Sequence, residues 1–273
     1  MRQICSLRAT ACIAATLALG SQRTFAETQF TNWRAFRDAS VQDYDFQWAK
    51  VGHAGNADWV GVHPPNPFAT VRTGGVQYRY RIAETEVTNR QWFEFVQAYA
   101  PYVQPQFANS SQFLGTAIGP ATGGGYALNE VNANRGVEIA WRFAARYVNW
   151  LHNGKGSEQS AFESGVYDTS TFGDVDGSFQ ITDQPQRSEG ARFFLPTRDE
   201  WAKAVYFDPD RFGEDQEGYW LWSYTSDTAP VAGAPGTPGA QTNAGTGSSY
   251  DILSYPDAQT PWGLHDASGS VRE

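Results

Sequence analysis

Cysteine is nearly absent from this chain. Its 273 residues contain only Cys5 and Cys12, and both lie close to the N-terminus. Beyond that stretch the chain has no thiol. These residues therefore offer no disulfide, no zinc-thiolate site and no cysteine nucleophile.

Other familiar catalytic patterns are missing as well. The four histidines, His53, His63, His152 and His265, share no metal-ligand spacing. The sequence contains neither a serine-hydrolase signature nor a P-loop. Carboxylates are abundant, but the sequence does not indicate which of them converge.

Long apolar runs are also lacking. Arg2 and Arg8 precede a short apolar run that ends near Leu19, and Thr24-Phe25-Ala26 suits a signal peptidase. The run is shorter than the about 20 residues that a bilayer-spanning helix needs. We expect a signal peptide over residues 1–26 that is cleaved after Ala26, with an uncleaved anchor as the alternative. The product would be secreted, periplasmic or held at the cell surface, without a transmembrane span.

Basic residues are fewer than acidic residues in this chain. The chain carries 20 Lys and Arg against 29 Asp and Glu, and removal of Arg2, Arg8 and Arg23 with the signal leaves 17 against 29, a formal charge of −12. A phosphate backbone would be repelled, so nucleic acid is not expected as a partner. Acidic surfaces also attract cations, but solubility is the simpler interpretation of this charge.

Glycine and aromatic residues are plentiful, with 27 glycines and 15% aromatics. This composition predicts a loop-rich fold pinned by large side chains, and not a helical bundle or a parallel sheet. Thr88 with Gln91, and Thr197 with Glu200, have the spacing of a capping box. Each pair predicts a junction at which an extended segment ends and a helix begins.

Apolar periodicity predicts three helices and several short strands. The helices begin at Asn89, at about Val137 and after Thr197, and tryptophans on their apolar faces are expected in the core: Trp92, Trp141, Trp150 and Trp201. Strands are expected within 41–62 and over 76–85, 191–195 and 218–222, with a hairpin over 162–181. The segments 103–136 and 230–249 are expected to be loops, and 64–67 a stiff proline connector.

Four sequence blocks occur in a recognisable order. They are Glu86-Val87-Thr88-Asn89, a helix that ends in Trp150-Leu151, Leu195-Pro196-Thr197-Arg198-Asp199-Glu200-Trp201, and Pro261-Trp262-Gly263-Leu264-His265-Asp266 with the residues up to Glu273. Over about residues 76–273 the chain resembles the formylglycine-generating enzyme, or sulfatase-modifying factor, family. Gly154 after Trp150-Leu151-His152-Asn153, and Gly218-Tyr219-Trp220, are similar to exported bacterial members.

The resemblance implies an irregular, loop-rich α+β fold related to C-type lectins, with about three helices and short antiparallel strands. The expected organisation is a signal peptide over 1–26, an N-terminal strand and linker over 27–75, and a sulfatase-modifying-factor-like domain over 76–273. In the family's enzymes, two cysteines beyond the closing block hold the copper that oxidises a substrate cysteine to formylglycine. The sequence stops at Glu273 inside that block. We therefore expect a domain truncated at its C-terminal end, with no copper bound to this chain.

The resemblance also implies calcium sites. Ala267, Ser270 and Arg272 depart from the family's closing pattern, and Ser270 replaces an asparagine that helps to bind calcium. Thr242-Asn243-Ala244 resembles a second site, where Asn243 and Asp251 would supply the oxygen ligands that calcium needs. Equally, Asn243 would only satisfy loop amides. Asp174-Val175-Asp176-Gly177 begins like a calcium loop but lacks the later ligands, which favours a simple turn.

Three functional hypotheses follow. The first is a non-catalytic binding module that holds a peptide, a glycan or a surface protein with its loops at 103–136 and 223–250, where Trp220 and Trp222 would line a groove. The second is a formylglycine-generating oxidase whose catalytic cysteines are missing from this chain. The third is a fragment with uncovered apolar surface and sheet edges that does not fold stably. For these 273 residues we place binding ahead of oxidation.

Overall fold

The computed structural model describes residues 10–11, 43–63, 66–175 and 180–269. Within these residues the chain forms five α-helices and two 3₁₀ turns. The longer helices are α1 (Asn89–Tyr99), α3 (Trp141–His152) and α5 (Arg198–Tyr206), and the short elements are α2 (Ser111–Leu114), α4 (Ser160–Glu163), η2 (Glu130–Asn132) and η3 (Thr169–Thr171). The three longer helices are those that the sequence predicts.

The strands are short and form two-stranded antiparallel pairs. The pairs are β2 (Trp48–Val51) with β5 (Tyr80–Ala83), β3 (Trp59–His63) with β4 (Asn66–Thr73), β6 (Ile118–Pro120) with β7 (Tyr126–Leu128), β9 (Phe207–Asp208) with β10 (Gly218–Tyr219), and β1 (Thr10–Ala11) with β8 (Ile139–Ala140). The α+β class and the loop-rich, antiparallel architecture are confirmed.

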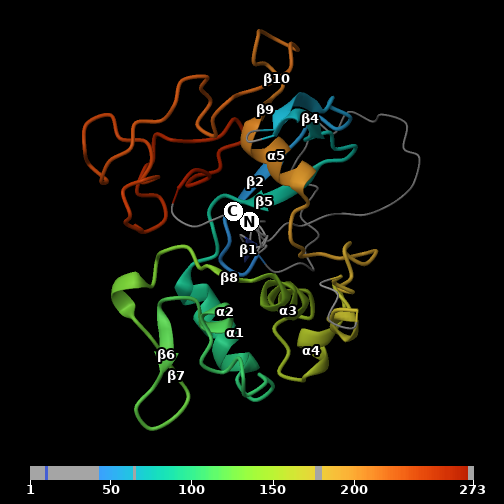
Figure 1. Cartoon of the computed structure of the whole chain (residues 1–273), viewed down its shortest axis with the longest axis vertical. Helices are drawn as coiled ribbons and strands as arrows, with labels where there is room; N and C mark the ends of the chain where they lie inside the picture. The colour runs from blue at the N-terminus through green and yellow to red at the C-terminus, as the bar shows by residue number, and fades with distance from the viewer. Residues whose placement is uncertain (1–9, 12–42, 64–65, 176–179, 270–273) are drawn as a thin grey trace, which may run out of the picture.

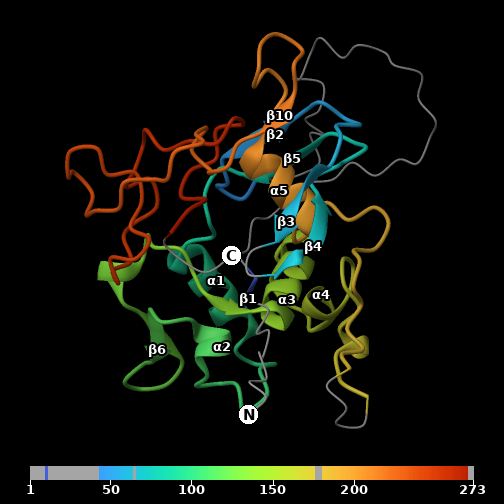
Figure 2. The same ribbon diagram turned by 45° about the horizontal axis from the view of Figure 1, so that its top comes forward.

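The elements divide the molecule into two halves. Helices α1 to α4 and the β6–β7 hairpin gather in one half, whereas α5 lies with β2 to β5, β9 and β10 in the other (Figures 1 and 2). The loops that follow β10 run along one flank in orange and red. No helix in the described part of the chain combines the length and apolar character required to cross a bilayer.

Both predicted capping boxes are present. The Thr88 hydroxyl accepts the amide of Gln91, and the Gln91 side chain accepts the Thr88 amide at 2.9 Å. Thr197 and Glu200 make the same reciprocal contacts at the start of α5. Because each box satisfies amides that a helix start leaves without partners, the sequence sets both starting points locally.

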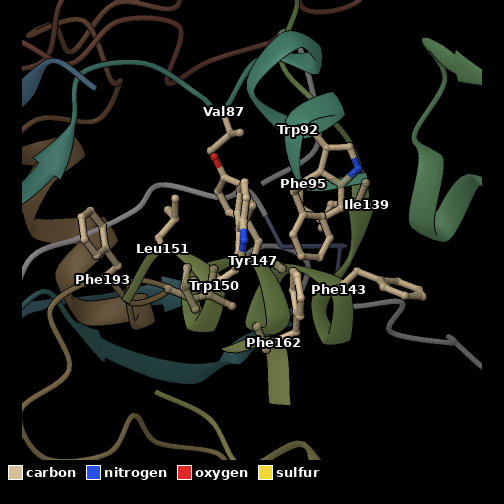
Figure 3. Close-up of a cluster of buried hydrophobic side chains, with 14 of the residues drawn as sticks. Val87, Trp92, Phe95, Ile139, Phe143, Tyr147, Trp150, Leu151, Phe162 and Phe193 are labelled. Atoms are coloured by element: carbon tan, nitrogen blue, oxygen red, sulfur yellow. The ribbon is translucent and has the colours of Figure 1, made fainter. Parts of the chain in front are cut away.

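The main core lies between α1 and α3. Trp92 and Phe95 from α1 meet Tyr147 and Trp150 from α3, with Phe162 beneath them (Figure 3). All five side chains are buried. Trp92 and Trp150 are therefore core residues as expected, whereas Trp141 and Trp201 are only partly buried.

A smaller hydrophobic cluster lies in the other half of the molecule. Val51, Tyr80 and Ile82 from the β2–β5 pair pack with Ala204 of α5 and Leu264 of the closing block. The closing block therefore contributes to a hydrophobic core and packs against the β2–β5 pair.

The predicted hairpin over 162–181 is wrong for most of its length. Asn149, fully buried on α3, donates to the carbonyls of Phe162 and Tyr167 and accepts the amides of Val166 and Tyr167. Helix α4 and the η3 turn occupy most of residues 160–171, and the Asn149 side chain holds the segment between them. Only Asp174 and Ile181 form an antiparallel bridge, and residues 176–179 of the expected turn lie outside the described residues.

Other boundaries also differ from the expectation. The segment 103–136 is not one long loop, because it contains α2, β6, β7 and η2. Helix α3 begins at Trp141 and not at Val137, since residues 136–137 bond to residues 87–88 and residues 139–140 form β8. Residues 66–67 of the expected connector belong to β4, and 64–65 lie outside the described residues.

The remaining differences are in the predicted strands. The described residues show no named strand over 191–195, although this segment is largely buried, and β5 is shorter than the strand expected over 76–85. Residues 1–9 and 12–42 lie outside the described residues, so cleavage after Ala26 stays a prediction.

Candidate functional site

Two turns after α5 carry the tryptophans that the sequence proposes as ligand contacts. The first turn, residues 209–217, joins β9 to β10, and the second, residues 220–228, follows β10 (orange in Figures 1 and 2). Both lie at the end of the molecule opposite the β6–β7 hairpin in Figure 1.

Hydrogen bonds from Trp220 connect the second turn to β9 and to the end of α5. Its indole N–H donates to the Asp208 carboxylate at 3.0 Å, and its main-chain N–H donates to the Tyr206 carbonyl at 2.9 Å. The Arg211 guanidinium lies 4.7 Å from the ring centroid. One face of this indole is therefore already covered by a cation from its own chain.

Trp222 is more open than Trp220. It is 37% exposed, and its amide donates to the Ser226 carbonyl at 2.9 Å, which closes a tight turn. Leu221, between the two tryptophans, is 62% exposed. The strand ends at Tyr219, so the expected strand over 218–222 is too long and the two tryptophans do not alternate along it.

Sequence reasoning missed the residues that link the two turns. Arg211 stacks between the rings of Phe212 and Trp220, at 4.5 and 4.7 Å from their centroids, and forms an ion pair with Asp227. Asp227 in turn accepts the amide of Leu221 at 3.2 Å. A single arginine among many acidic residues between 208 and 227 is the sequence signal that indicates such a linking role.

Phe212 is the most exposed aromatic side chain in this region, at 63%. Its ring packs over Gly218, where a Cβ would come within 2.6 Å of the ring. Phe212, Trp220, Leu221 and Trp222 together are called the aromatic hairpin surface below. Stacking on Arg211 and packing on Gly218 hold Phe212 and Trp220 in place, and main-chain hydrogen bonds position Leu221 and Trp222.

Carboxylates surround this surface. Residues 208–227 contain six acidic side chains and one basic side chain: Asp208, Asp210, Glu214, Asp215, Glu217 and Asp227 against Arg211. Asp208 and Asp210 accept hydrogen bonds within the turn, and Glu217 pairs with His53 at 2.8 Å. The local charge is therefore strongly negative.

Asn243 lies in the loop that docks onto the closing block. It is 4% exposed, its side-chain amide donates to the Ser248 carbonyl at 2.6 Å, and its own carbonyl accepts from the Thr246 amide and hydroxyl. The neighbouring Thr242 hydroxyl donates to the Ser268 carbonyl at 2.6 Å. Gly269 approaches so closely that a Cβ would collide with the Asn243 side-chain oxygen.

Asp251 faces a different part of the chain. Its carboxylate lies 3.9 Å from the Arg135 guanidinium, and its backbone forms an antiparallel bridge with the same residue. Ser270, the third expected metal ligand, lies outside the described residues. In the part of the chain that the structure describes, no group of three or more His, Cys, Asp and Glu side chains is arranged to hold a metal ion.

Asp266 is a buried carboxyl group that the sequence did not single out. Its carboxylate accepts a hydrogen bond from the Leu253 amide at 2.6 Å. The amide of the preceding residue, His265, donates to the Glu84 carbonyl at 2.7 Å. Burial raises the pKa of the Asp266 carboxyl, while the Leu253 amide and His265 act in the opposite direction. Asp266 thereby ties the closing block to the turn after Asp251.

The comparisons agree with the arrangement of these blocks. A family model described as "Sulfatase-modifying factor enzyme 1-like domain" matches residues 52–273. A search of curated proteins and a search of solved structures returned no match. The family match spans well over half of the chain and includes both capping boxes, the aromatic hairpin surface and the closing loops. The chain belongs to the FGE-sulfatase family, the sulfatase-modifying factor enzyme 1-like domains.

Proposed function

We propose that these 273 residues act as a non-catalytic binding module built on the family's scaffold. The observation that carries the proposal is the aromatic hairpin surface, where Phe212, Leu221 and Trp222 are exposed by 63%, 62% and 37%. Exposed apolar side chains on two turns that the Arg211–Asp227 ion pair links are typical of an interaction site. The partner classes are a peptide, a glycan or a surface protein.

The rigidity of the surface supports binding. Arg211 is held by Asp227 and by two aromatic rings, so the turns need little further ordering when a partner binds. A contact surface that is already ordered loses less conformational entropy on association. Composition supports a non-catalytic role for these residues, because no thiol occurs after Cys12.

The proposal is tested by selection against the whole chain. A phage-displayed random peptide library and an oligosaccharide array serve as probes, and ligands are measured again with Trp222→Ala and Phe212→Ala. Removal of an aromatic contact at a binding surface typically weakens affinity by about tenfold or more. Val131→Ala is the matched control, since Val131 is 77% exposed on η2. If no ligand is recovered, or if all three variants bind equally, the surface is not the binding site.

The second candidate is a formylglycine-generating oxidase, which the family match over residues 52–273 favours. Copper held by two thiolates would supply the oxidising chemistry in that enzyme, and the residues after Cys12 provide no thiolate for it. A product of the natural transcript read beyond Glu273, incubated with copper and a cysteine peptide, tests this candidate. Mass spectrometry detects formylglycine, and its formation only by a longer product supports the alternative.

Calcium is proposed as a structural ion at the contact between Asn243 and the closing block. Oxygen donors cluster there, including the Asn243 amide, the Thr242 hydroxyl and the Ser268 carbonyl, which suits a hard cation. The donor set fits only in part, because Asp251 faces Arg135. Calorimetric titration with Ca²⁺ and Mg²⁺ tests the site. We expect Asn243→Ala to abolish Ca²⁺ binding and the exposed control Gln112→Ala to leave it unchanged, and binding that survives Asn243→Ala contradicts the proposal.

Export through the secretory pathway is proposed on the basis of the N-terminal pattern around Arg2, Arg8 and Ala26. N-terminal sequencing of the protein recovered outside the cytoplasm tests it. A new N-terminus at Glu27 supports cleavage after Ala26, and an intact N-terminus contradicts it.

A further inference from the structure

We propose that the partner of the aromatic hairpin surface is a cationic peptide segment in which lysine or arginine alternates with leucine or aromatic residues. This inference rests on the binding function proposed above and names the chemistry of the partner. Its basis is the combination of exposed apolar side chains with carboxylates that form no ion pair within the described part of the chain.

The free carboxylates lie at the tip of the first turn. Glu214 and Asp215 directly follow Phe212 and Gly213, and both are exposed. In the described part of the chain, neither forms an ion pair, whereas Asp227 pairs with Arg211 and Glu217 pairs with His53. These charges stand two and three residues after Phe212, and screening is incomplete over separations shorter than the Debye length of about 8 Å at physiological ionic strength. A cation bound at Phe212 would therefore experience their field.

The structure also contains an intramolecular example of the proposed contact. The Arg211 guanidinium lies over the rings of Phe212 and Trp220 and pairs with a carboxylate. A lysine or arginine of a partner would make the same kind of contact with the exposed rings of Phe212 and Trp222 and with Glu214 or Asp215. Leu221 and Trp222 would receive the partner's apolar side chains.

Charge complementarity favours a cationic peptide over the other candidates. A neutral oligosaccharide can stack on an aromatic ring but gains nothing from the excess of carboxylates. Anionic glycans, nucleic acids and anionic membranes would be repelled by six acidic side chains opposed by one arginine. A peptide with alternating basic and apolar residues matches both features of the surface.

Fluorescence anisotropy with the whole chain tests the inference. The probes are a short labelled peptide of alternating lysine and leucine with one phenylalanine, its glutamate counterpart and its serine counterpart. We expect the lysine peptide alone to bind, with affinity that falls as salt increases.

The charge-removing double variant E214Q/D215N should weaken binding of the lysine peptide by about three- to tenfold, since each exposed pair contributes modestly. The double variant E158Q/E189Q removes the same charge from exposed positions elsewhere and serves as the matched control. We expect Trp222→Ala to weaken binding further, because it removes an apolar and a cation–π contact.

The outcomes separate this inference from the proposed function. The serine peptide or an oligosaccharide could bind through Trp222 as tightly as the lysine peptide does. That result overturns the inference of a cationic partner but supports the proposed binding module. Equal weakening by E214Q/D215N and by the control pair also overturns the inference. If no probe binds through Trp222 or Phe212, both proposals fail.

Discussion

The ammonium group of Lys203 donates a hydrogen bond to the main-chain carbonyl of His53 across 2.8 Å. Lys203 is fully buried on α5, and His53 has a left-handed conformation, with a φ of 49°, in the turn between β2 and β3. The His53 ring pairs with Glu217 at the start of β10. One lysine thus connects the α5 helix to a turn that also holds the aromatic hairpin.

The first prediction concerns the pH dependence of stability. Burial lowers the pKa of Lys203 to about 8, with Glu217 opposing this effect. The unfolded chain keeps an ordinary lysine pKa of about 10.4, so it binds more protons than the folded chain between these values. This group therefore makes the free energy of unfolding rise as the pH increases from about 8 to about 10.4.

Urea unfolding of the wild type and of Lys203→Met at about pH 7 and about pH 9.5 measures the effect. The difference in the free energy of unfolding, wild type minus variant, should be more favourable to the wild type at the higher pH. Only the wild type has a buried ammonium group that becomes neutral as the pH rises. Lys50→Met removes an exposed charge and serves as the control. An equal difference at both pH values contradicts the prediction.

The second prediction concerns the helix caps. Thr197→Ala removes the hydroxyl that accepts the Glu200 amide at the start of α5. The free energy of unfolding should fall by about 1 kcal/mol, the usual cost of losing such a cap. Thr197→Ser keeps the hydroxyl and should retain most of the stability. If chemical denaturation gives the same midpoint for the alanine and serine variants, the capping box does not contribute as expected.

Local signals such as these explain why α1 and α5 were predictable. A capping box involves residues three apart, so the sequence contains all of its parts. Asn149 shows the opposite case. Its side chain bonds to the segment around Phe162 and Tyr167, and nothing near position 149 indicates which carbonyls it will meet. The hairpin prediction failed because α4 and η3 occupy the expected first strand, and Asn149 fixes the segment between them.

The candidate site was predictable only in outline. The tryptophans single out the segment after β9, but the surroundings of Trp220 and Trp222 depend on where β10 ends and on the position of Arg211. Asn243 lies in a loop whose Thr242 bonds to Ser268 of the closing block, and its metal-binding role stays a prediction. The direction of Asp251 toward Arg135 could not be read from the sequence, because residue 135 lies in a segment that looked like featureless loop.

The third prediction concerns a buried ion pair. Arg187 reaches the fully buried Glu200 carboxylate at 2.9 Å, donates to the Tyr78 hydroxyl at 2.8 Å and stacks on the Phe194 ring at 3.7 Å. Arg187→Ala leaves a buried carboxylate without its cation, which typically costs about 3 kcal/mol. Denaturant titration measures the loss.

The matched control is Arg198→Ala, in which an exposed arginine 4.0 Å from Asp199 is removed. Exposed pairs contribute little, so this variant should unfold within about 0.5 kcal/mol of the wild type. Equal effects of the two substitutions would show that the burial of Glu200 does not determine the strength of the Arg187 contact.

The last prediction concerns the contact between the loop at 242–248 and the closing block. Gly269 has a φ of 105°, and a Cβ there would collide with the Asn243 side-chain oxygen and lie 2.7 Å from the Thr242 hydroxyl. The alanine in Gly269→Ala would therefore have a strained backbone, and its Cβ would displace the oxygens proposed to hold calcium.

Gly119→Ala is the control, since Gly119 has open space around its Cβ position. We expect Gly269→Ala to lower the free energy of unfolding by about 1 to 3 kcal/mol and to speed proteolysis within 230–249, with no such change for Gly119→Ala. Unchanged proteolysis of Gly269→Ala would mean that the loop is held by contacts other than its docking onto the closing block.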